Sequence, residues 1–440
     1  MQAIPDKFSY SRSAIFPGWR ENAKTWTRER AQALRADTKV DPIIRWAFAM
    51  FLFSIPYETL DAGLSDNAFS LSKLTGYLFI LTALLQPRTS FRRIPLALWC
   101  FGTYLLVYVL TSLYQAPEFR AEIVNRLVTL VQMLVLLWIS ANLLRSVQTV
   151  TYALGGFAFS CVVLSVLQLL GVTRVAYRGW DNRASALGEN PNIIASVLAL
   201  GLLALIWFIY RRSRGYWLVK VLSWPFTLLI VIAIVDTGSR GAPVALGVGA
   251  ITIALSKSLG RSRLLNVTVI LILLGAVIWL SYYEENVRGR WLRTFETGSM
   301  AGREKRFPEA WNMFMSHPIV GWGPVANYME LGVRIHKVGG DPHNLYLWVL
   351  TEVGLAGALP YFAGLAICFS VAWQGRRGPH GVLPLALFLT VAAINMSTTW
   401  QTRKLHWLVL GYALAAAPPS YRRLTSLVER PRIGLRRIMS

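Results

Sequence analysis

Residues 303–357 read REKRFPEAWNMFMSHPIVGWGPVANYMELGVRIHKVGGDPHNLYLWVLTEVGLAG and lie between apolar stretches long enough to cross a membrane. The segment is polar and basic, and glycine and proline interrupt it repeatedly. It contains Asp341-Pro342-His343-Asn344, directly before a new apolar helical pattern. A titratable imidazole among arginines at the entrance of a membrane helix makes His343 the strongest candidate for a catalytic residue.

The composition indicates a polytopic membrane protein. Hydrophobic residues make up 54% and charged residues only 15% of the 440 residues, whereas about 25% of the residues in soluble domains are charged. The 17 Trp, 17 Tyr and 20 Phe suit aromatic belts at both membrane interfaces. The net charge of +23 comes mostly from loops and tails, so we expect anionic membrane lipids, and no nucleic acid, as partners.

Apolar stretches near the ~20 residues needed to cross the hydrocarbon core recur along the chain. We therefore predict an all-α polytopic integral membrane protein with about twelve transmembrane helices. The predicted spans are 42–57, 67–86, 94–114, 124–144, 149–171, 192–210, 217–236, 241–256, 264–283, 344–374, 382–398 and 405–417.

The distribution of Lys and Arg predicts the orientation. With the N-terminus in the cytoplasm, nearly every short loop on that side is basic, and the first outside loop, 57–66, carries three acidic residues and no basic residue. Both termini are then cytoplasmic. The expected organisation is a basic cytoplasmic arm (1–41), nine membrane helices (42–283), a large periplasmic loop with short helices (284–342), three further membrane helices (343–417) and a basic cytoplasmic tail (418–440).

Several outside segments break this pattern because they carry basic residues. Ionisable groups close to the membrane are costly and are usually functional, so these segments predict an extracytoplasmic site for an anion. The exceptions include Arg183 after the fifth span, Arg240 between the seventh and eighth, Arg303 and Arg306 in the long loop, and Arg403 and Lys404 before the last span.

The first candidate segment runs from Arg183 to Asn190-Pro191-Asn192. Asn192 is a predicted N-cap of the sixth span, and a helix N-terminus offers free N–H groups to a phosphate. The alternative is an ordinary loop and cap, with Arg183 reaching lipid headgroups.

The second candidate segment is Thr237-Gly238-Ser239-Arg240-Gly241, which joins the seventh and eighth spans with almost no loop. Arg can bind a diphosphate through two parallel hydrogen bonds, which Lys cannot. The alternative is a tight turn with an interfacial Arg. We favour a functional Arg240, because a long flexible loop would place an interfacial Arg at lower cost.

Within the long loop, residues 304–316 predict a short amphipathic helix whose aromatic side chains serve packing, ended by His317-Pro318. His343 lies at or just before a helix start, where the positive end of the helix dipole disfavours an imidazolium and leaves a ring that can accept a proton. A capping or interfacial role is the commoner one for a lone His, and His336 and His406 are rivals. His343 is preferred because it shares a membrane face with the arginines.

The three cysteines, Cys100, Cys161 and Cys368, all fall in apolar stretches and are predicted to be small hydrophobic core residues. No Cys/His cluster has metal-ligand spacing, so neither a metal nor another cofactor is expected. Guanidinium groups with one imidazole suit transfer from a lipid diphosphate to a hydroxyl.

These motifs resemble those of the O-antigen ligase (WaaL) and polymerase superfamily of bacterial envelope glycosyltransferases. The matching pieces occur in order along the chain: Arg183 to Asn190-Pro191-Asn192; Thr237-Gly238-Ser239-Arg240-Gly241; Arg306, Trp311, His317-Pro318 and Gly321-x-Gly323; and His343-Asn344 with Glu352-x-Gly354-Leu355-x-Gly357.

The resemblance implies metal-independent, inverting transfer of an O-antigen glycan from undecaprenyl diphosphate at the periplasmic face of the inner membrane. For a ligase, the acceptor is a sugar hydroxyl of lipid A-core, and the product is complete lipopolysaccharide. By position, His343 is the implied base and Arg183 and Arg240 bind the diphosphate. Either Arg303 or Arg306 corresponds to the loop arginine, and Asn192 and Asn344 are weaker candidates for substrate binding.

Three alternatives remain at this stage. A repeat-unit polymerase differs from a ligase only in its acceptor, and we prefer the ligase because the chain has one loop of moderate length. A protein O-oligosaccharyltransferase often has a further periplasmic region after its last helices, whereas this chain has a basic tail there. A lipid or solute transporter would predict charges within the spans and repeated halves, but few such charges and no repeat are seen.

Overall fold

The computed structural model describes residues 40–59, 70–176, 184–210, 217–256 and 285–417, together with individual residues between 268 and 283. A helix lies at every predicted span except 264–283, which falls mostly outside the described residues. Almost all of the predicted arm (1–41) and the whole of the predicted tail (418–440) also lie outside them.

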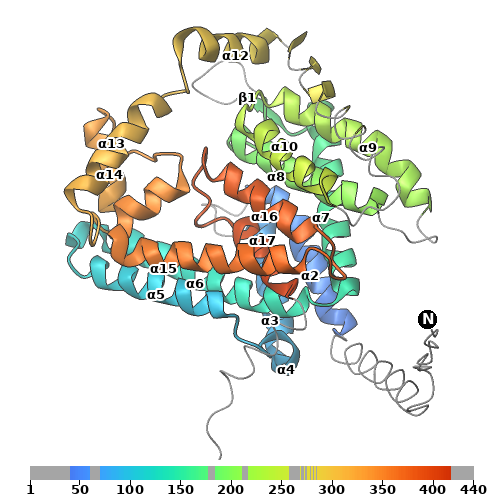
Figure 1. Ribbon diagram of the computed structural model, residues 1–440, viewed down its shortest axis with the longest axis horizontal. Helices are drawn as coiled ribbons and strands as arrows, with labels where there is room; N and C mark the ends of the chain where they lie inside the picture. Colours follow the sequence, from blue (N-terminus) through green and yellow to red (C-terminus); the bar gives the residue numbers. More distant parts are fainter. Residues whose placement is uncertain are drawn as a thin grey trace, which may run out of the picture.

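Three helices run side by side along one side of the molecule (Figure 1). They are α5 (Leu96–Ser112), α6 (Arg120–Leu143) and α15 (Leu345–Gly375). Helix α15 packs on α5, and the last helix, α17 (Lys404–Ala415), packs on α6. Short helical turns precede α5 and α6: α4 (Pro87–Ser90) and η2 (Pro117–Phe119). A third, η1 (Ile55–Tyr57), follows residue Ser54.

A second group of helices packs beside the first. It comprises α2 (Pro42–Ser54), α3 (Leu71–Leu84), α7 (Val147–Leu169), α8 (Pro191–Tyr210), α9 (Trp217–Asp236) and α10 (Gly241–Ala254). Helix α16 (Leu383–Ile394) joins the two groups, because it packs on both α10 and α17.

Four helical segments are long and apolar enough to cross a membrane, judged by length and composition within the described residues: Pro117–Leu143, Val147–Leu169, Pro191–Ile209 and Leu345–Gly375. Six further apolar helices are shorter. The chain therefore has the helical, apolar character of a membrane protein, and twelve spans remain a prediction.

One prediction of the fold needs correction, because the chain is not entirely helical. Residues Arg174–Ala176 (β1) and Ala184–Ala186 (β2) pair as two antiparallel strands. The chain leaves α7 through Gly171, whose φ of +78° is in the left-handed region, and the next backbone groups pair across the connection. Three-residue strands are too short to show the alternation that predicts a strand.

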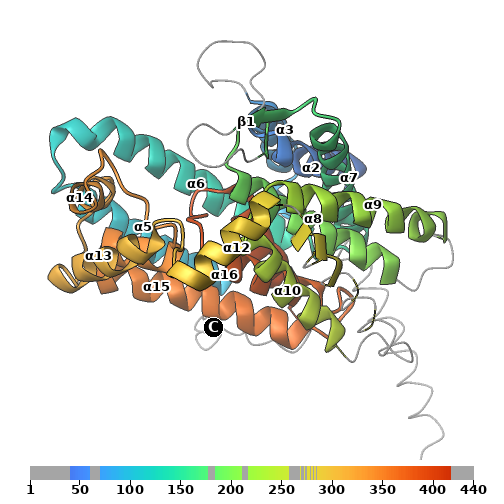
Figure 2. The same cartoon turned by 90° about the horizontal axis from the view of Figure 1, so that it is seen from above.

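The predicted loop 284–342 contains three helices, as expected: α12 (Glu285–Thr297), α13 (Arg303–Ser316) and α14 (Ala326–Arg334). Helix α13 matches the predicted helix 304–316 and buries Ala310, Met313 and Phe314. Seen from above, α12 lies between α13 and α10 (Figure 2).

The loop after α13 docks on a break in α15. At Gly354, φ is +56° and ψ is −163°, so the helix is interrupted, and this conformation is essentially restricted to glycine. The backbone groups freed by the break are paired with the loop: Trp322 N donates to Thr351 O, Gly323 N to Glu352 O, Leu355 N to Pro318 O and Ala356 N to Ile319 O, at 2.8–2.9 Å. The break thus fixes the loop relative to the start of α15.

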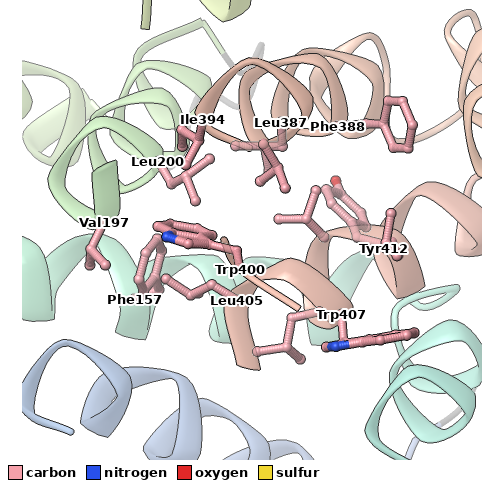
Figure 3. Packing of buried hydrophobic residues seen from close by; sticks show 14 of the residues in the cluster. Phe157, Val197, Leu200, Leu387, Phe388, Ile394, Trp400, Leu405, Trp407 and Tyr412 are labelled. Carbon is pink, nitrogen blue, oxygen red and sulfur yellow. The ribbon is translucent and has the colours of Figure 1, made fainter. Parts of the chain in front are cut away.

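The core holds the connection between α16 and α17 in place. Trp400 is 1% exposed, and Figure 3 shows it among Phe157, Val197 and Leu405 of α7, α8 and α17. Trp407 is fully buried, and its Nε1 donates to Gln401 O at 2.7 Å. Burial of two tryptophans makes this connection a rigid support for whatever contacts it.

The predicted core role of the cysteines is confirmed for two of them. Cys161 and Cys368 are buried, Cys100 is partly buried, and all three are free thiols.

Candidate active site

The connection between α16 and α17 is where the distant segments of the candidate site meet. Arg303 Nη2 donates to Ser397 O at 2.8 Å, and Asn344 Nδ2 to Met396 O at 3.4 Å. A Cβ atom on Gly241 would lie 2.7 Å from Ser397 Oγ, so the start of α10 touches the same residue. Only glycine at position 241 permits this approach.

Three helix N-termini converge there. Arg240 is the N-cap residue of α10, Arg303 is the first residue of α13 and Asn344 is the N-cap of α15. The N-terminus of a helix carries partial positive charge and unsatisfied N–H groups. Their convergence favours a bound anion.

The Arg240 guanidinium is held by α12 and the residues that follow it. Its Nη1 donates to Arg290 O at 2.9 Å and to Ser299 O at 3.4 Å, and also to Thr294 Oγ1. Burial, and then the positive charge of Arg293, lower the pKa of Arg240. A partly buried guanidinium beside another cation is a good partner for an incoming anion.

Arg303 lies in the same cationic cluster. Burial lowers its pKa, and the nearby Arg240 and Arg306 lower it further, while Asp341 acts in the opposite direction. Its Nε is buried without a hydrogen-bond partner in the described part of the chain. Because an unpaired buried donor and neighbouring like charges both cost free energy, an anion bound here would stabilise the cluster.

The contacts of Arg303 and Arg306, the two candidates for the loop arginine, differ in the structure. The charge of Arg240 helps to lower the pKa of Arg303, whereas Arg306 Nη1 donates to the backbone oxygen of Asp341 at 3.3 Å. We therefore expect Arg303, rather than Arg306, to bind an anion together with Arg240.

His343 directly precedes the N-cap of α15, as the sequence predicts. Its φ of +54° is left-handed, which is uncommon for any residue except glycine, and its N–H donates to Asp341 Oδ1 at 2.7 Å. Thr399 Oγ1 donates to the same oxygen at 2.7 Å. His343 Nδ1 lies 3.6 Å from Asp341 Oδ2, in ion-pair range. This turn holds the imidazole beside a carboxylate.

Asp341 belongs to the motif that contains His343, but the sequence alone predicts no role for it. Burial acts to raise the pKa of its carboxyl, but hydrogen bonds from His343 and Thr399 outweigh burial and lower it. Asp341 is therefore ionised near neutral pH and can stabilise an imidazolium that forms at His343. The spacing of two residues from Asp341 to His343, which is that of an Asx turn, was a usable signal.

We expect Asp341→Asn to reduce turnover without abolishing it. The amide keeps the shape but removes the charge that favours the protonated imidazole, and the 3.6 Å separation makes this contact a supporting one. A fall in kcat of about tenfold is expected, with an unchanged KM for the donor. Steady-state transfer kinetics check this, and an unchanged kcat would exclude the supporting role.

Two asparagines that are weaker candidates for substrate binding have contacts at helix starts, and their binding of substrate stays a prediction. Asn344 Oδ1 accepts hydrogen bonds from Tyr346 N at 3.0 Å and Leu347 N at 3.1 Å, so it caps α15. The predicted N-cap Asn192 lies inside α8, and Asn190 precedes the helix instead, accepting from Asn192 N at 2.9 Å. The error arose because Pro191 suits the first helical position, which puts the cap one residue earlier. Arg183 lies outside the described residues, so its role stays a prediction.

The rival histidines have other environments. His406 is buried and contacts the Tyr361 hydroxyl and the Asn395 side chain, both at 3.1 Å. His336 lies exposed in the turn after α14, and His317 packs on Trp322 with the ring centroids 4.2 Å apart. Among the histidines, His343 is thus the one beside the arginine cluster.

Arg403 and Lys404 do not join the anion site that their position suggested. Arg403 contacts both carboxylate oxygens of Glu189, at 3.0 and 3.3 Å, and Lys404 pairs with Glu58. Sequence reasoning missed these pairs because the partners lie more than 200 residues away along the chain. Their charges are balanced locally and support the connection before α17.

Part of the chain is similar to known proteins. Residues 225–362 match the model of the O-antigen ligase family (Wzy_C). The chain is also 24% identical over 247 residues to an O-antigen ligase of Pseudomonas aeruginosa; the alignment covers 54% of this chain and 57% of that relative. The chain is thus similar to O-antigen ligases over part of its length. The match spans little more than half the length of the curated relative.

The O-antigen ligase match includes most of the site. Arg240, Arg303, Arg306 and His343 lie within residues 225–362, whereas the supporting segment with Ser397 and Thr399 lies beyond them. The apolar helices indicate a membrane protein, and residues 225–362 are similar to the O-antigen ligase family.

Proposed function

We propose that this protein is an O-antigen ligase. It transfers the O-antigen glycan from undecaprenyl diphosphate to a sugar hydroxyl of lipid A-core, at the periplasmic face of the inner membrane, by a metal-independent inverting reaction. The observation that carries the proposal is that three segments converge. The start of α10 with Arg240, the start of α13 with Arg303 and the start of α15 after His343 all meet at the connection between α16 and α17.

In the proposed reaction, His343 accepts the proton of the acceptor hydroxyl as its oxygen attacks the anomeric carbon of the donor. The bond between that carbon and the diphosphate oxygen breaks, and undecaprenyl diphosphate leaves with the bonding electrons. Arg240 and Arg303 stabilise the negative charge that grows on the leaving group. One displacement from the face opposite the leaving group inverts the anomeric carbon.

The proposed periplasmic location rests on the charge pattern of the sequence and on contacts between segments that are predicted to lie on the same side of the membrane. Segments predicted outside contact one another: Gln115 Nε2 donates to Trp322 O at 3.1 Å, and Glu58 and Glu189 pair with Lys404 and Arg403. At the predicted inside, Arg93 N donates to Asn142 Oδ1 at 3.1 Å. Cysteine labelling of intact cells at Val338, which is 96% exposed, tests the side of the membrane on which the loop lies.

Arg240→Ala and Arg303→Ala should each lower kcat by about 100-fold, which is the loss typical for removing one donor that stabilises developing negative charge. The Lys variants should recover activity only in part, since Lys cannot donate two parallel hydrogen bonds to a diphosphate. Transfer kinetics on purified protein measure both effects.

Arg334→Ala is the matched control for these two variants. Arg334 ends α14, pairs with Glu330 at 2.7 Å, and lies 3.9 Å from Glu309 and 5.5 Å from the centroid of the Trp322 ring. Its activity should stay within about twofold of wild type, as expected for a surface ion pair of small energetic weight. Equal losses in all three arginine variants would contradict a specific diphosphate site.

Deletion of the gene, followed by gel analysis of lipopolysaccharide, tests the ligase against the other activities of the superfamily. A ligase predicts loss of all attached O-antigen, with rescue by the wild-type gene. One remaining repeat unit would indicate a polymerase. An intact lipopolysaccharide ladder together with loss of glycosylated protein would indicate a protein O-oligosaccharyltransferase.

A further inference from the structure

A cavity of about 520 Å³ lies between α3 and α6, beside the candidate active site. It exists because α3 packs on α2 while α6 packs on α17 and α5. One end of the cavity is formed by Asp341 and Thr399, which are hydrogen-bonded to each other. The cavity therefore reaches the carboxylate that lies 3.6 Å from the His343 ring.

One wall of the cavity is a polar stripe on an otherwise apolar helix. Asn125, Thr129 and Gln132 of α6 line the cavity together with the pair Glu122–Arg126. These positions recur every three or four residues, so they share one face of α6. The segment that carries them is apolar enough to cross a membrane. Polar groups there are costly unless they face a cavity or a partner, which points to a ligand.

Aromatic rings complete the cavity. Trp348 and Tyr328 line it, with the Arg126 guanidinium 5.6 and 6.0 Å from their ring centroids, and Tyr77 of α3 lines it as well. A sugar ring offers an apolar C–H face and a rim of hydroxyl groups. Aromatic faces beside amide and hydroxyl groups match both parts of a sugar, and the volume suits a small-molecule site.

The charges of the cavity favour hydroxyls over a diphosphate. Of its four basic residues, Arg126, Arg403 and Lys404 are paired with Glu122, Glu189 and Glu58, and Lys73 is the fourth. A diphosphate would have to displace a carboxylate at each of these three pairs, whereas the Arg303 Nε is a buried donor with no hydrogen-bond partner among the residues that the structure describes. Anion binding therefore belongs to the arginine cluster, and the cavity is left for an uncharged sugar.

We propose that this cavity binds the acceptor sugar of a membrane-anchored glycolipid, with Gln132 and Thr129 on its wall as specificity residues. The inference rests on the proposed function. It places the acceptor on the α6 side of Asp341 and the donor diphosphate at Arg240 and Arg303. Apolar side chains exposed beside the cavity, Leu74 and Leu78 of α3 and Val124 and Val128 of α6, suit the lipid part of such an acceptor.

Gln132→Leu and Thr129→Val in the full-length protein test the assignment. Both remove hydrogen-bonding groups while keeping an apolar helix, and Thr129→Val also keeps the side-chain shape. With purified lipopolysaccharide that lacks O-antigen as the acceptor, the acceptor KM should rise about tenfold for each variant. The donor KM should stay within about twofold. Val131→Leu, whose side chain is 44% exposed on another face of α6, should match wild type.

A binding measurement without donor separates this inference from the proposed function. The His343→Ala protein should bind the same lipopolysaccharide, and adding Gln132→Leu should abolish most of that binding. If wild-type protein binds but transfers nothing, the proposed function fails while the cavity assignment stands. If both cavity variants keep wild-type binding and acceptor KM, or raise the donor KM instead, the cavity assignment is wrong.

Discussion

His343→Ala should lower kcat for glycan transfer by about 1,000-fold, within the range that a positioned general base contributes. The backbone of His343 has a left-handed φ, and its N–H donates to Asp341 Oδ1. These two features position the side chain. Alanine keeps neither the proton acceptor nor its geometry. The acceptor hydroxyl would then attack while still protonated. Steady-state transfer by purified protein measures the loss.

The same variant should keep its affinity for the donor, because the diphosphate is assigned to Arg240 and Arg303 rather than to the imidazole. Binding of undecaprenyl diphosphate to the His343→Ala protein tests this separation. His336→Ala, in an exposed turn, is the control and should transfer at the wild-type rate. Full activity of His343→Ala would refute the assignment of the base.

Gly354→Ala should prevent most of the protein from folding. Its φ and ψ of +56° and −163° belong to a region essentially restricted to glycine, which costs about 1–3 kcal/mol for other residues. An added Cβ would also overlap the Ile319 carbonyl group. Overpacking adds about 1–3 kcal/mol, so the total is a large part of a typical folding free energy.

Size-exclusion profiles and thermal unfolding in detergent measure this effect. Gly102→Ala in α5 is the matched control, since nothing lies within 4 Å of an added Cβ there, and alanine favours a helix over glycine by about 1 kcal/mol. It should leave the profile unchanged or raise the melting temperature. A Gly354→Ala protein as stable as wild type would show that the break in α15 is not built as described.

Local patterns were enough to predict most helices and to select candidate residues for the site. Apolar stretches end where charged or turn residues begin, so the helix bounds followed from composition, as for α9 and α10. Arg240 and His343 were identifiable because each breaks a local rule: an arginine in a tight outside turn, and an imidazole before a helix start. Such violations concentrate at functional sites.

Features set by distant contacts were not predictable. The roles of Ser397 and Thr399 depend on residues 58 or more positions away in sequence. The polar stripe on α6 was hidden because the helix is apolar on average. Arg403 and Lys404 looked like free cations because their acidic partners lie on other helices and loops.

An experimental structure of the full chain with added undecaprenyl diphosphate tests the central claim most directly. We predict diphosphate density within hydrogen-bonding distance of Arg240 and Arg303, on the side of Asp341 away from the cavity between α3 and α6. The His343 ring should lie between the diphosphate and that cavity. Diphosphate bound inside the cavity, at Arg403 and Lys404 with their carboxylate partners displaced, would contradict the account.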